Sequence, residues 1–150
     1  LDRKLRIINE NISELNEWIE VTKSAYKNTY AYEWQGDSLL LARESMLYTY
    51  IENFKYKFEK EPSLKSIKDI AEIISWNVWQ MDGLKGVVPL SCGKIKTKSV
   101  NLFGEENIDH LFCKGCLYGN INNHNGIYCL IMDWSETDIK GKKIKFIELF

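Results

Sequence analysis

The stretch Ile73-Ile74-Ser75-Trp76-Asn77-Val78-Trp79-Gln80-Met81-Asp82-Gly83 holds the change of pattern that decides the fold class. Apolar residues with helical spacing precede this change, at Leu64, Ile67, Ile70, Ala71 and Ile74. The helical pattern stops at Ser75, and residues 78–81 are typical of a strand that ends in the turn dipeptide Asp82-Gly83. We therefore expect a helix, capped by Ser63, that leads into a short strand.

An earlier aromatic-rich stretch, residues 30–34, is also typical of a short strand, and Gly36 marks the turn after it. The next apolar stripe predicts a helix over residues 39–58, capped by Asp37 or Ser38 and stopped at Glu61-Pro62. Two strands separated by a pair of helices match the crossover that parallel neighbours in a sheet require. The sequence therefore favours the α/β class for residues 1–90.

The two ends of the chain follow other patterns. Apolar residues at alternating spacings of three and four predict one amphipathic helix over residues 2–26. Residues 126–134 and 143–149 are β-rich runs joined by a polar turn, which we interpret as a hairpin. Residues 92–125, ahead of this hairpin, have little periodicity. A segment of this length is unusual without secondary structure unless a cross-link holds it in place.

Length and composition limit the class of protein. A chain of 150 residues with 45% hydrophobic content supports one domain with its own core. The net charge of −1 does not indicate the cationic surface of a protein that grips phosphates. No apolar run approaches the ~20 residues that cross a bilayer, and the first residues lack the apolar stretch of a signal peptide. We expect a single cytoplasmic domain over residues 1–150, with no membrane contact, in which an α/β half (1–90) precedes a cysteine-containing insert and hairpin (91–150).

The cysteines cluster in the second half of the chain with the spacing C-x20-C-x2-C-x12-C, at Cys92, Cys113, Cys116 and Cys129. The segment Cys113-Lys114-Gly115-Cys116 has the knuckle spacing in which two thiolates bind one ion. A tetrahedral zinc site would staple this region to the hairpin. Its ligands would be all four thiolates, or three thiolates with one imidazole from His110 or His124.

Other interpretations of the cysteines are open. One is that all four are reduced residues with no shared role, because free cysteine is often buried and one C-x2-C is not specific. Another is a disulfide framework, which is less favoured in a chain with no secretory signal. A redox pair or a catalytic thiol is less favoured still, because a redox pair normally lies at a strand-to-helix junction, which the pattern around Cys113 does not indicate.

Several stretches resemble N6-adenine DNA methyltransferases of restriction-modification systems. Tyr30-Ala31-Tyr32-Glu33, followed by Asp37-Ser38-Leu39 and Ala42-Arg43-Glu44-Ser45-Met46-Leu47, is similar to the family's second strand and following helix. Residues 73–84 resemble its next strand and acidic turn. Residues 87–92, 113–116 and 124–134 resemble an insert found in some of these enzymes. The likeness covers about residues 30–150.

The resemblance implies a partial, Rossmann-like methyltransferase unit with a β-rich, zinc-stapled C-terminal part. It also implies S-adenosylmethionine as a cofactor, with Glu33 binding the ribose hydroxyls and Asp82 accepting the adenine amine. Without the resemblance, Glu33 is an exposed charge at a strand end, and Asp82-Gly83 is an ordinary turn.

Two motifs of that family are absent from this chain. No two of the nine glycines form a G-x-G, so the loop that admits the methionine end of the cofactor has no counterpart. The catalytic Asn/Asp-Pro-Pro-aromatic tetrapeptide cannot be formed, because Pro62 and Pro89 are the only prolines. We therefore expect no catalytic residues and no self-sufficient methylation.

Three functions are compatible with these features. The first is a non-catalytic binding protein on a methyltransferase-derived scaffold, such as a mobile-element inhibitor of a host defence nuclease (anti-CRISPR-like). The second is a truncated or split subunit of an S-adenosylmethionine-dependent N6-adenine DNA methyltransferase. Both imply a protein partner. The third is a small zinc-bearing nucleic-acid module that uses the lysines Lys94, Lys96, Lys98, Lys140, Lys142, Lys143 and Lys145.

Overall fold

The computed structural model describes the chain except for residues 94, 101–105, 136–140 and 150, and except for the side chains of residues 95–100 and 106–111. Contacts divide the chain into two compact units, which we describe separately. The first, called the helical unit, comprises Leu1–Gln80 and Ile131–Lys143. The second, called the cysteine unit, comprises Met81–Leu130 and Ile144–Phe150. The described residues form helices and small sheets, which confirms a mixed α and β composition, while a Rossmann-like arrangement stays a prediction.

The helical unit begins with two helices where the sequence predicted one. Helix α1 is Asp2–Asn11 and helix α2 is Leu15–Lys27. The continuous helix predicted for residues 2–26 is wrong at the break, where Ile12 is extended and Glu14 caps α2 by accepting a hydrogen bond from the Glu17 N–H. The break lets the Trp18 indole donate to the Asn9 side chain at 2.8 Å, so the two helices pack on each other.

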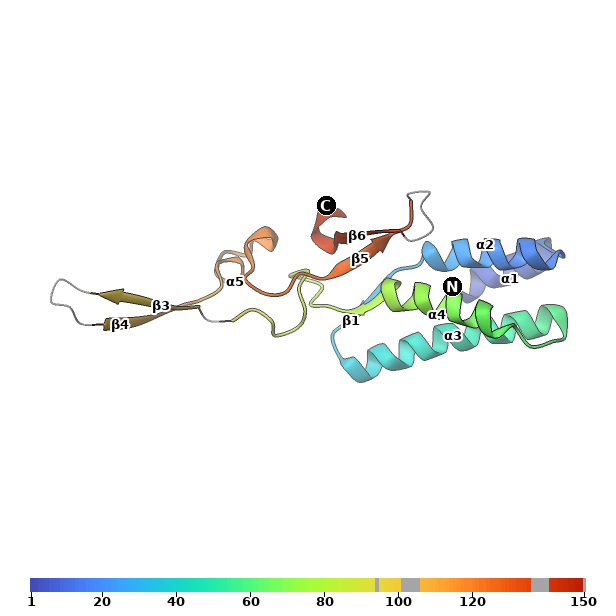
Figure 1. The fold of residues 1–150 in the computed structure, drawn as a ribbon, viewed down its shortest axis with the longest axis horizontal. Coiled ribbons are helices and arrows are strands. Elements are labelled where there is room, and N and C mark those ends of the chain that lie inside the picture. The colour runs from blue at the N-terminus through green and yellow to red at the C-terminus, as the bar shows by residue number, and fades with distance from the viewer. Residues whose placement is uncertain (94, 101–105, 136–140, 150) are drawn as a thin grey trace. The chain divides into compact units, whose positions relative to one another are not determined.

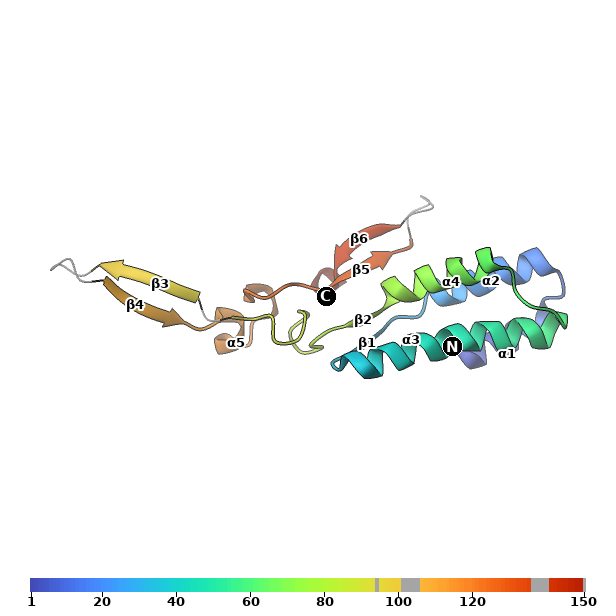
Figure 2. The ribbon, with the colours of Figure 1, turned by 60° about the horizontal axis from the view of Figure 1, so that its bottom comes forward.

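Two longer helices complete this unit (Figure 1). Helix α3 is Gly36–Phe58, and its N-cap is Gln35 rather than the predicted Asp37 or Ser38. Helix α4 is Leu64–Asn77, and Ser63 caps it as predicted, accepting from the Ser66 N–H at 3.2 Å. Figures 1 and 2 show α1 to α4 lying side by side.

Aromatic rings fill the interior of the helical unit. The Trp18 ring lies 5.8 Å from that of Tyr50 and 5.5 Å from that of Phe54, and all three side chains are buried. Ile70 on α4 and Tyr26 on α2 are fully buried in the same cluster. The predicted apolar faces of α2, α3 and α4 therefore meet in one core.

The two short strands of the helical unit pair in parallel. Strand β1 is Ala31–Glu33 and strand β2 is Val78–Gln80, with Tyr32 opposite Trp79. Helices α3 and α4 form the connection between them. The predicted strand, helix pair and strand, and the parallel pairing that this order requires, are confirmed.

The cysteine unit contains a hairpin that the sequence did not predict. Strands β3, Ile95–Val100, and β4, Glu106–Leu111, pair antiparallel with Ile95 opposite Leu111 (Figure 2). The cysteine unit also contains helix α5, Lys114–Tyr118, and a 3-10 turn, Ile121–Asn123. Residues 92–125 are therefore only partly loop.

The last two strands are β5, Leu130–Asp133, and β6, Lys142–Lys145, which form a two-stranded sheet. The predicted pairing of the two final β-rich runs is confirmed. Both runs are shorter than predicted, because the first strand begins at Leu130 rather than residue 126, and Phe146–Leu149 forms a 3-10 turn instead of continuing the second strand.

Among the described residues, no helix is long and apolar enough to cross a membrane.

Candidate metal centre

Three cysteines and one histidine bring their ligand atoms together in the cysteine unit. The sulfur atoms of Cys92, Cys113 and Cys116 and a ring nitrogen of His124 all lie within 4.8 Å of one another. The Nδ1 atom of His124 is 3.5 Å from the Sγ atoms of Cys92 and Cys113, and 3.7 Å from that of Cys116. A tetrahedral zinc ion with Zn–S of about 2.3 Å and Zn–N of about 2.0–2.1 Å sets sulfur and nitrogen about 3.5 Å apart. The four side chains therefore fit a zinc ion.

Local structure places each ligand. Cys113 is the N-cap of α5, and Cys116 lies one turn later on the same helix, as the C-x2-C spacing requires. Cys92 follows a tight turn in which Ser91 donates to the Val88 carbonyl from both its N–H and its hydroxyl. His124 follows the 3-10 turn at Ile121–Asn123. Three separate segments thus converge on one point.

Hydrogen bonds fix the segment that carries His124. The Tyr128 hydroxyl accepts from the His124 N–H at 2.9 Å and donates to the Ile121 carbonyl at 3.0 Å. The Asn125 N–H donates to the Cys113 sulfur at 3.3 Å, and the Asn125 side chain donates to the Gly93 carbonyl at 2.8 Å. Outer contacts of this kind orient metal ligands and support affinity.

Two glycines make room for the ligands. A Cβ atom at Gly115 would lie 2.7 Å from both the ring and the backbone nitrogen of His124. A Cβ atom at Gly126 would lie 2.9 Å from the Cys92 sulfur and 2.6 Å from the Ser91 hydroxyl. Both positions therefore require glycine for the approach of other groups.

The protein environment divides the thiols into two kinds. Burial opposes ionisation of Cys113, yet hydrogen bonds from the backbone N–H groups of Asn125 and Cys116 lower the pKa of its thiol to about 6. Burial, together with the neighbouring Cys113 and Cys116 thiols, raises the pKa of Cys92 to about 11. A bound cation favours the thiolate at each ligand, so metal binding would release the proton of Cys92.

Cys129 is not a member of this group. It is buried, and burial raises the pKa of its thiol to about 11. Its backbone donates to the Gly86 carbonyl and accepts from the Phe146 N–H. Of the four cysteines predicted as ligands, the structure brings together three, and His124 completes the set, as in the predicted alternative of three thiolates and one imidazole. The His110 side chain lies outside the described residues.

The carboxylates assigned to a cofactor by resemblance make local contacts. Glu33 ends β1, and its side chain accepts from the N–H groups of Trp34 and Gln35. Asp82 is buried in the cysteine unit, where its side chain accepts from the Leu84 N–H and pairs with Lys85 at 3.0 Å. These contacts match a strand-end carboxylate and a turn aspartate, and S-adenosylmethionine binding stays a prediction.

Two of the lysines proposed for nucleic-acid contact stack on aromatic rings. The Lys143 ammonium lies 4.3 Å from the centre of the Trp76 ring, and that of Lys145 lies 5.5 Å from the Tyr128 ring. The side chains of Lys94, Lys96, Lys98 and Lys140 lie outside the described residues.

Sequence reasoning missed most of the residues that support the metal centre. The glycine of the C-x2-C, Gly115, was expected to let the backbone turn toward the sulfurs, but Asn125, Gly126 and Tyr128 were given no role at the metal, although they follow His124 closely. Comparisons with protein-family models, curated proteins and solved structures find no match for this chain.

Proposed function

We propose that this chain is a non-catalytic binding protein whose cysteine unit is held in shape by a structural zinc ion. The observation that carries the proposal is the set of four protein ligand atoms at the spacing of a zinc tetrahedron. Catalytic zinc sites keep one position for water or substrate, whereas structural sites are closed by four protein ligands. A site filled by Cys92, Cys113, Cys116 and His124 has no such open position.

A structural role also suits the small core of the cysteine unit. Its buried apolar side chains, among those described, are Met81, Val87, Cys113 and Cys129. So few groups supply little hydrophobic free energy, and small units of this kind depend on metals or disulfides for stability. Zinc binding would supply the folding free energy that so small a core does not provide.

Exposed apolar side chains support a binding role for the same unit. Leu84 is 92% exposed, Leu90 is 88% exposed and Ile127 is 68% exposed. Leu90 also has a φ of 60°, in the left-handed region that is unfavourable for a leucine. Strained, exposed positions of this kind are concentrated at sites that contact partners.

The partner that we propose is a nuclease of a host defence system, with the chain acting as a mobile-element inhibitor. The support is the sequence resemblance to DNA-modifying enzymes, together with the absence of the methylation motifs from this chain. In a DNA-cleavage assay with an RNA-guided nuclease, we expect cleavage to stop at one chain per nuclease, without methylation of the DNA. Cleavage that continues at a large molar excess would contradict this assignment.

The second candidate is a subunit of an S-adenosylmethionine-dependent N6-adenine DNA methyltransferase. The parallel pairing of β1 and β2 through α3 and α4 favours it, because cofactors bind outside the carboxyl ends of parallel strands and Glu33 ends β1. In this proposal a second chain supplies the glycine-rich loop and the catalytic tetrapeptide.

Native mass spectrometry with and without S-adenosylmethionine separates the two candidates. The binding-protein proposal predicts one zinc per chain and no cofactor adduct. A cofactor adduct that is lost in the Glu33→Ala variant would support the methyltransferase subunit instead.

A further inference from the structure

Helix α3 carries apolar residues on two sides. One side packs into the core through Tyr50 and Phe54. The other side, called the outer face, presents Leu41, Tyr48 and Tyr56, which are 65%, 54% and 81% exposed. These positions are seven and eight residues apart, so they recur along one side of the helix. A contiguous apolar side that faces solvent is typical of an interaction surface.

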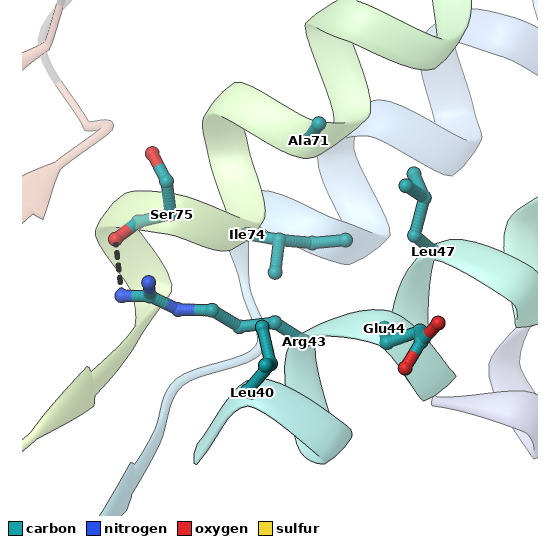
Figure 3. A pocket seen from close by; sticks show the side chains of 7 residues that line it. All are labelled: Leu40, Arg43, Glu44, Leu47, Ala71, Ile74 and Ser75. Carbon is teal, nitrogen blue, oxygen red and sulfur yellow. Dashed lines mark hydrogen bonds between the residues drawn. The ribbon is translucent and has the colours of Figure 1, made fainter. Parts of the chain in front are cut away.

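A groove between α3 and α4 adjoins the outer face (Figure 3). Its volume is about 340 Å³, and its apolar lining comes from Leu40, Leu47, Ala71 and Ile74. Glu44 belongs both to the lining of the groove and to the outer face, since it lies three and four residues from Leu41 and Tyr48. A large aliphatic side chain fits a groove of this size and character.

Arg43 lines the groove, and its guanidinium is hydrogen-bonded to backbone carbonyls of the helical unit. Its guanidinium donates to the Ser75 carbonyl at 3.2 Å (Figure 3) and to the Val78 carbonyl at 2.8 Å. Only the bond to Ser75 is drawn in the figure. Ser75 lies in the last turn of α4, where a helix leaves carbonyls without intrahelical partners, and Val78 begins β2. The Arg43 guanidinium therefore binds backbone carbonyls of the fold and does not serve as a binding group for a ligand in the groove.

The charges left on the outer face are negative. Asp37, Glu44 and Glu52 lie along the same side of α3 as Leu41 and Tyr48, and all three are exposed. None of the three takes part in an ion pair with another described residue, whereas Lys55, on this same side, pairs with Glu61 at 2.7 Å. The apolar positions are therefore interleaved with unpaired carboxylates.

We propose that the outer face of α3 and the adjoining groove dock an amphipathic helix of a partner protein, a helix that bears leucine-like residues flanked by lysine and arginine. One apolar side chain enters the groove, others pack on Leu41 and Tyr48, and the cations meet Asp37, Glu44 and Glu52. The outer face is about 28 Å long from Asp37 to Tyr56, which matches a partner helix of about 19 residues. The same carboxylates repel phosphates, so the surface suits neither nucleic acid nor an anionic membrane.

This inference rests on the proposed binding function and adds a second docking surface, on the helical unit, to the exposed apolar side chains of the cysteine unit. A synthetic leucine–lysine peptide with helical spacing is the probe, and a leucine–glutamate peptide of the same pattern is its control. We expect the full chain to bind the leucine–lysine peptide in a fluorescence anisotropy titration at near-physiological salt and to leave the leucine–glutamate peptide unbound. Binding should weaken about tenfold or more in Tyr48→Ala and in Glu44→Lys.

Glu10→Lys is the matched control, because Glu10 is exposed on α1 and belongs neither to the outer face nor to the lining of the groove, and its substitution makes the same change of charge. Unchanged binding in this variant, with unchanged thermal unfolding in all three variants, supports the docking surface. Equal weakening by Glu10→Lys, or no binding of the leucine–lysine peptide, would overturn it. So would a dimer in sedimentation that Tyr48→Ala dissociates, because a second copy would then cover the outer face. Inhibition in the DNA-cleavage assay and the zinc content are measured separately, so failure of peptide binding at α3 is distinguishable from failure of the proposed function.

Discussion

The Trp134 indole donates a hydrogen bond of 2.8 Å to the side-chain oxygen of Asn77, a fully buried residue at the end of α4. The Asn77 amide nitrogen donates to the carbonyls of Tyr26, Lys27 and Thr29, at 3.0, 2.9 and 3.2 Å. Two of these carbonyls belong to the last turn of α2, and that of Tyr26 also accepts from the Thr29 N–H at 3.0 Å. One side chain therefore joins α2, α4 and the segment after β5.

Replacing Asn77 should destabilise the helical unit strongly. Asn77→Ala leaves three carbonyls and the Trp134 N–H without this partner, so we expect a loss of about 2–4 kcal/mol in the free energy of unfolding. Urea denaturation followed by far-UV circular dichroism measures it. Trp134→Tyr, which removes only one of these bonds, should cost less. An Asn77→Ala variant as stable as the parent chain would show that the network contributes nothing.

Replacing Thr22 by valine should stabilise the helical unit, in contrast to the loss of stability expected for Asn77→Ala. Its hydroxyl is fully buried on α2 and has no hydrogen-bond partner among the described residues. Valine has nearly the same shape without the polar atom, so Thr22→Val should raise the free energy of unfolding by about 1 kcal/mol. Thr22→Ser keeps the hydroxyl and loses a methyl group, and it should be less stable than the parent. A Thr22→Val chain that unfolds at lower denaturant concentration would indicate a partner for the hydroxyl.

Gly115 should be required for the metal centre. In Gly115→Ala the new methyl group would overlap the His124 ring, and we expect zinc affinity to fall about 10- to 100-fold. Competition with a zinc chelator of known affinity measures the change. Gly93→Ala is the control, since a Cβ atom there meets no other group within 4 Å. Similar affinities for the two variants would mean that His124 is not held against Gly115.

Tyr128 should support zinc binding through its hydroxyl alone. Tyr128→Phe keeps the ring and removes the bridge between the His124 N–H and the Ile121 carbonyl, so we expect zinc affinity to fall about tenfold. Tyr118→Phe removes a hydroxyl from a residue that is 80% exposed and should leave the affinity unchanged. If Tyr128→Phe binds zinc as tightly as the parent chain, the bridge does not position His124.

Zinc removal should affect the two units differently. The aromatic core of the helical unit contains none of the four ligands, whereas the cysteine unit has few buried apolar side chains. We expect a chelator to collapse the amide chemical-shift dispersion of residues 81–130 and to leave the helical circular dichroism of α1 to α4 largely intact. Spectra of residues 81–130 that do not change on chelation would exclude a structural metal.

Local signals predicted the parts of the fold that depend on local chemistry. Ser63 caps α4, and the connection through α3 and α4 makes β1 and β2 parallel. The helical pattern stops at Ser75, two residues before α4 ends at Asn77. The break between α1 and α2 was missed because the apolar spacing continues through Ile12 and Leu15, while the break itself depends on an extended residue and a glutamate cap. The β3–β4 hairpin was missed because its strands are mostly polar and carry no apolar alternation to reveal them.

The sequence predicted a zinc site in this segment, but it did not decide which four residues are the ligands. The C-x2-C of Cys113 and Cys116 fixes two ligands, because Cys113 caps α5 and Cys116 lies one turn later on the same helix. The choice between Cys129 and His124 depends on tertiary structure, since Cys129 is buried with its N–H bonded to the Gly86 carbonyl, while Gly115 admits His124 to the cluster. No spacing in the sequence contains that information.

Zinc K-edge X-ray absorption of the purified chain tests the central claim most directly, because it identifies the atoms bound to the metal. A first shell of three sulfurs at about 2.3 Å and one nitrogen at about 2.0–2.1 Å is the predicted result, converting to a shell without that nitrogen in His124→Ala. A shell of four sulfurs would assign Cys129 to the site in place of His124, and a folded chain that binds no zinc would contradict the structural metal itself.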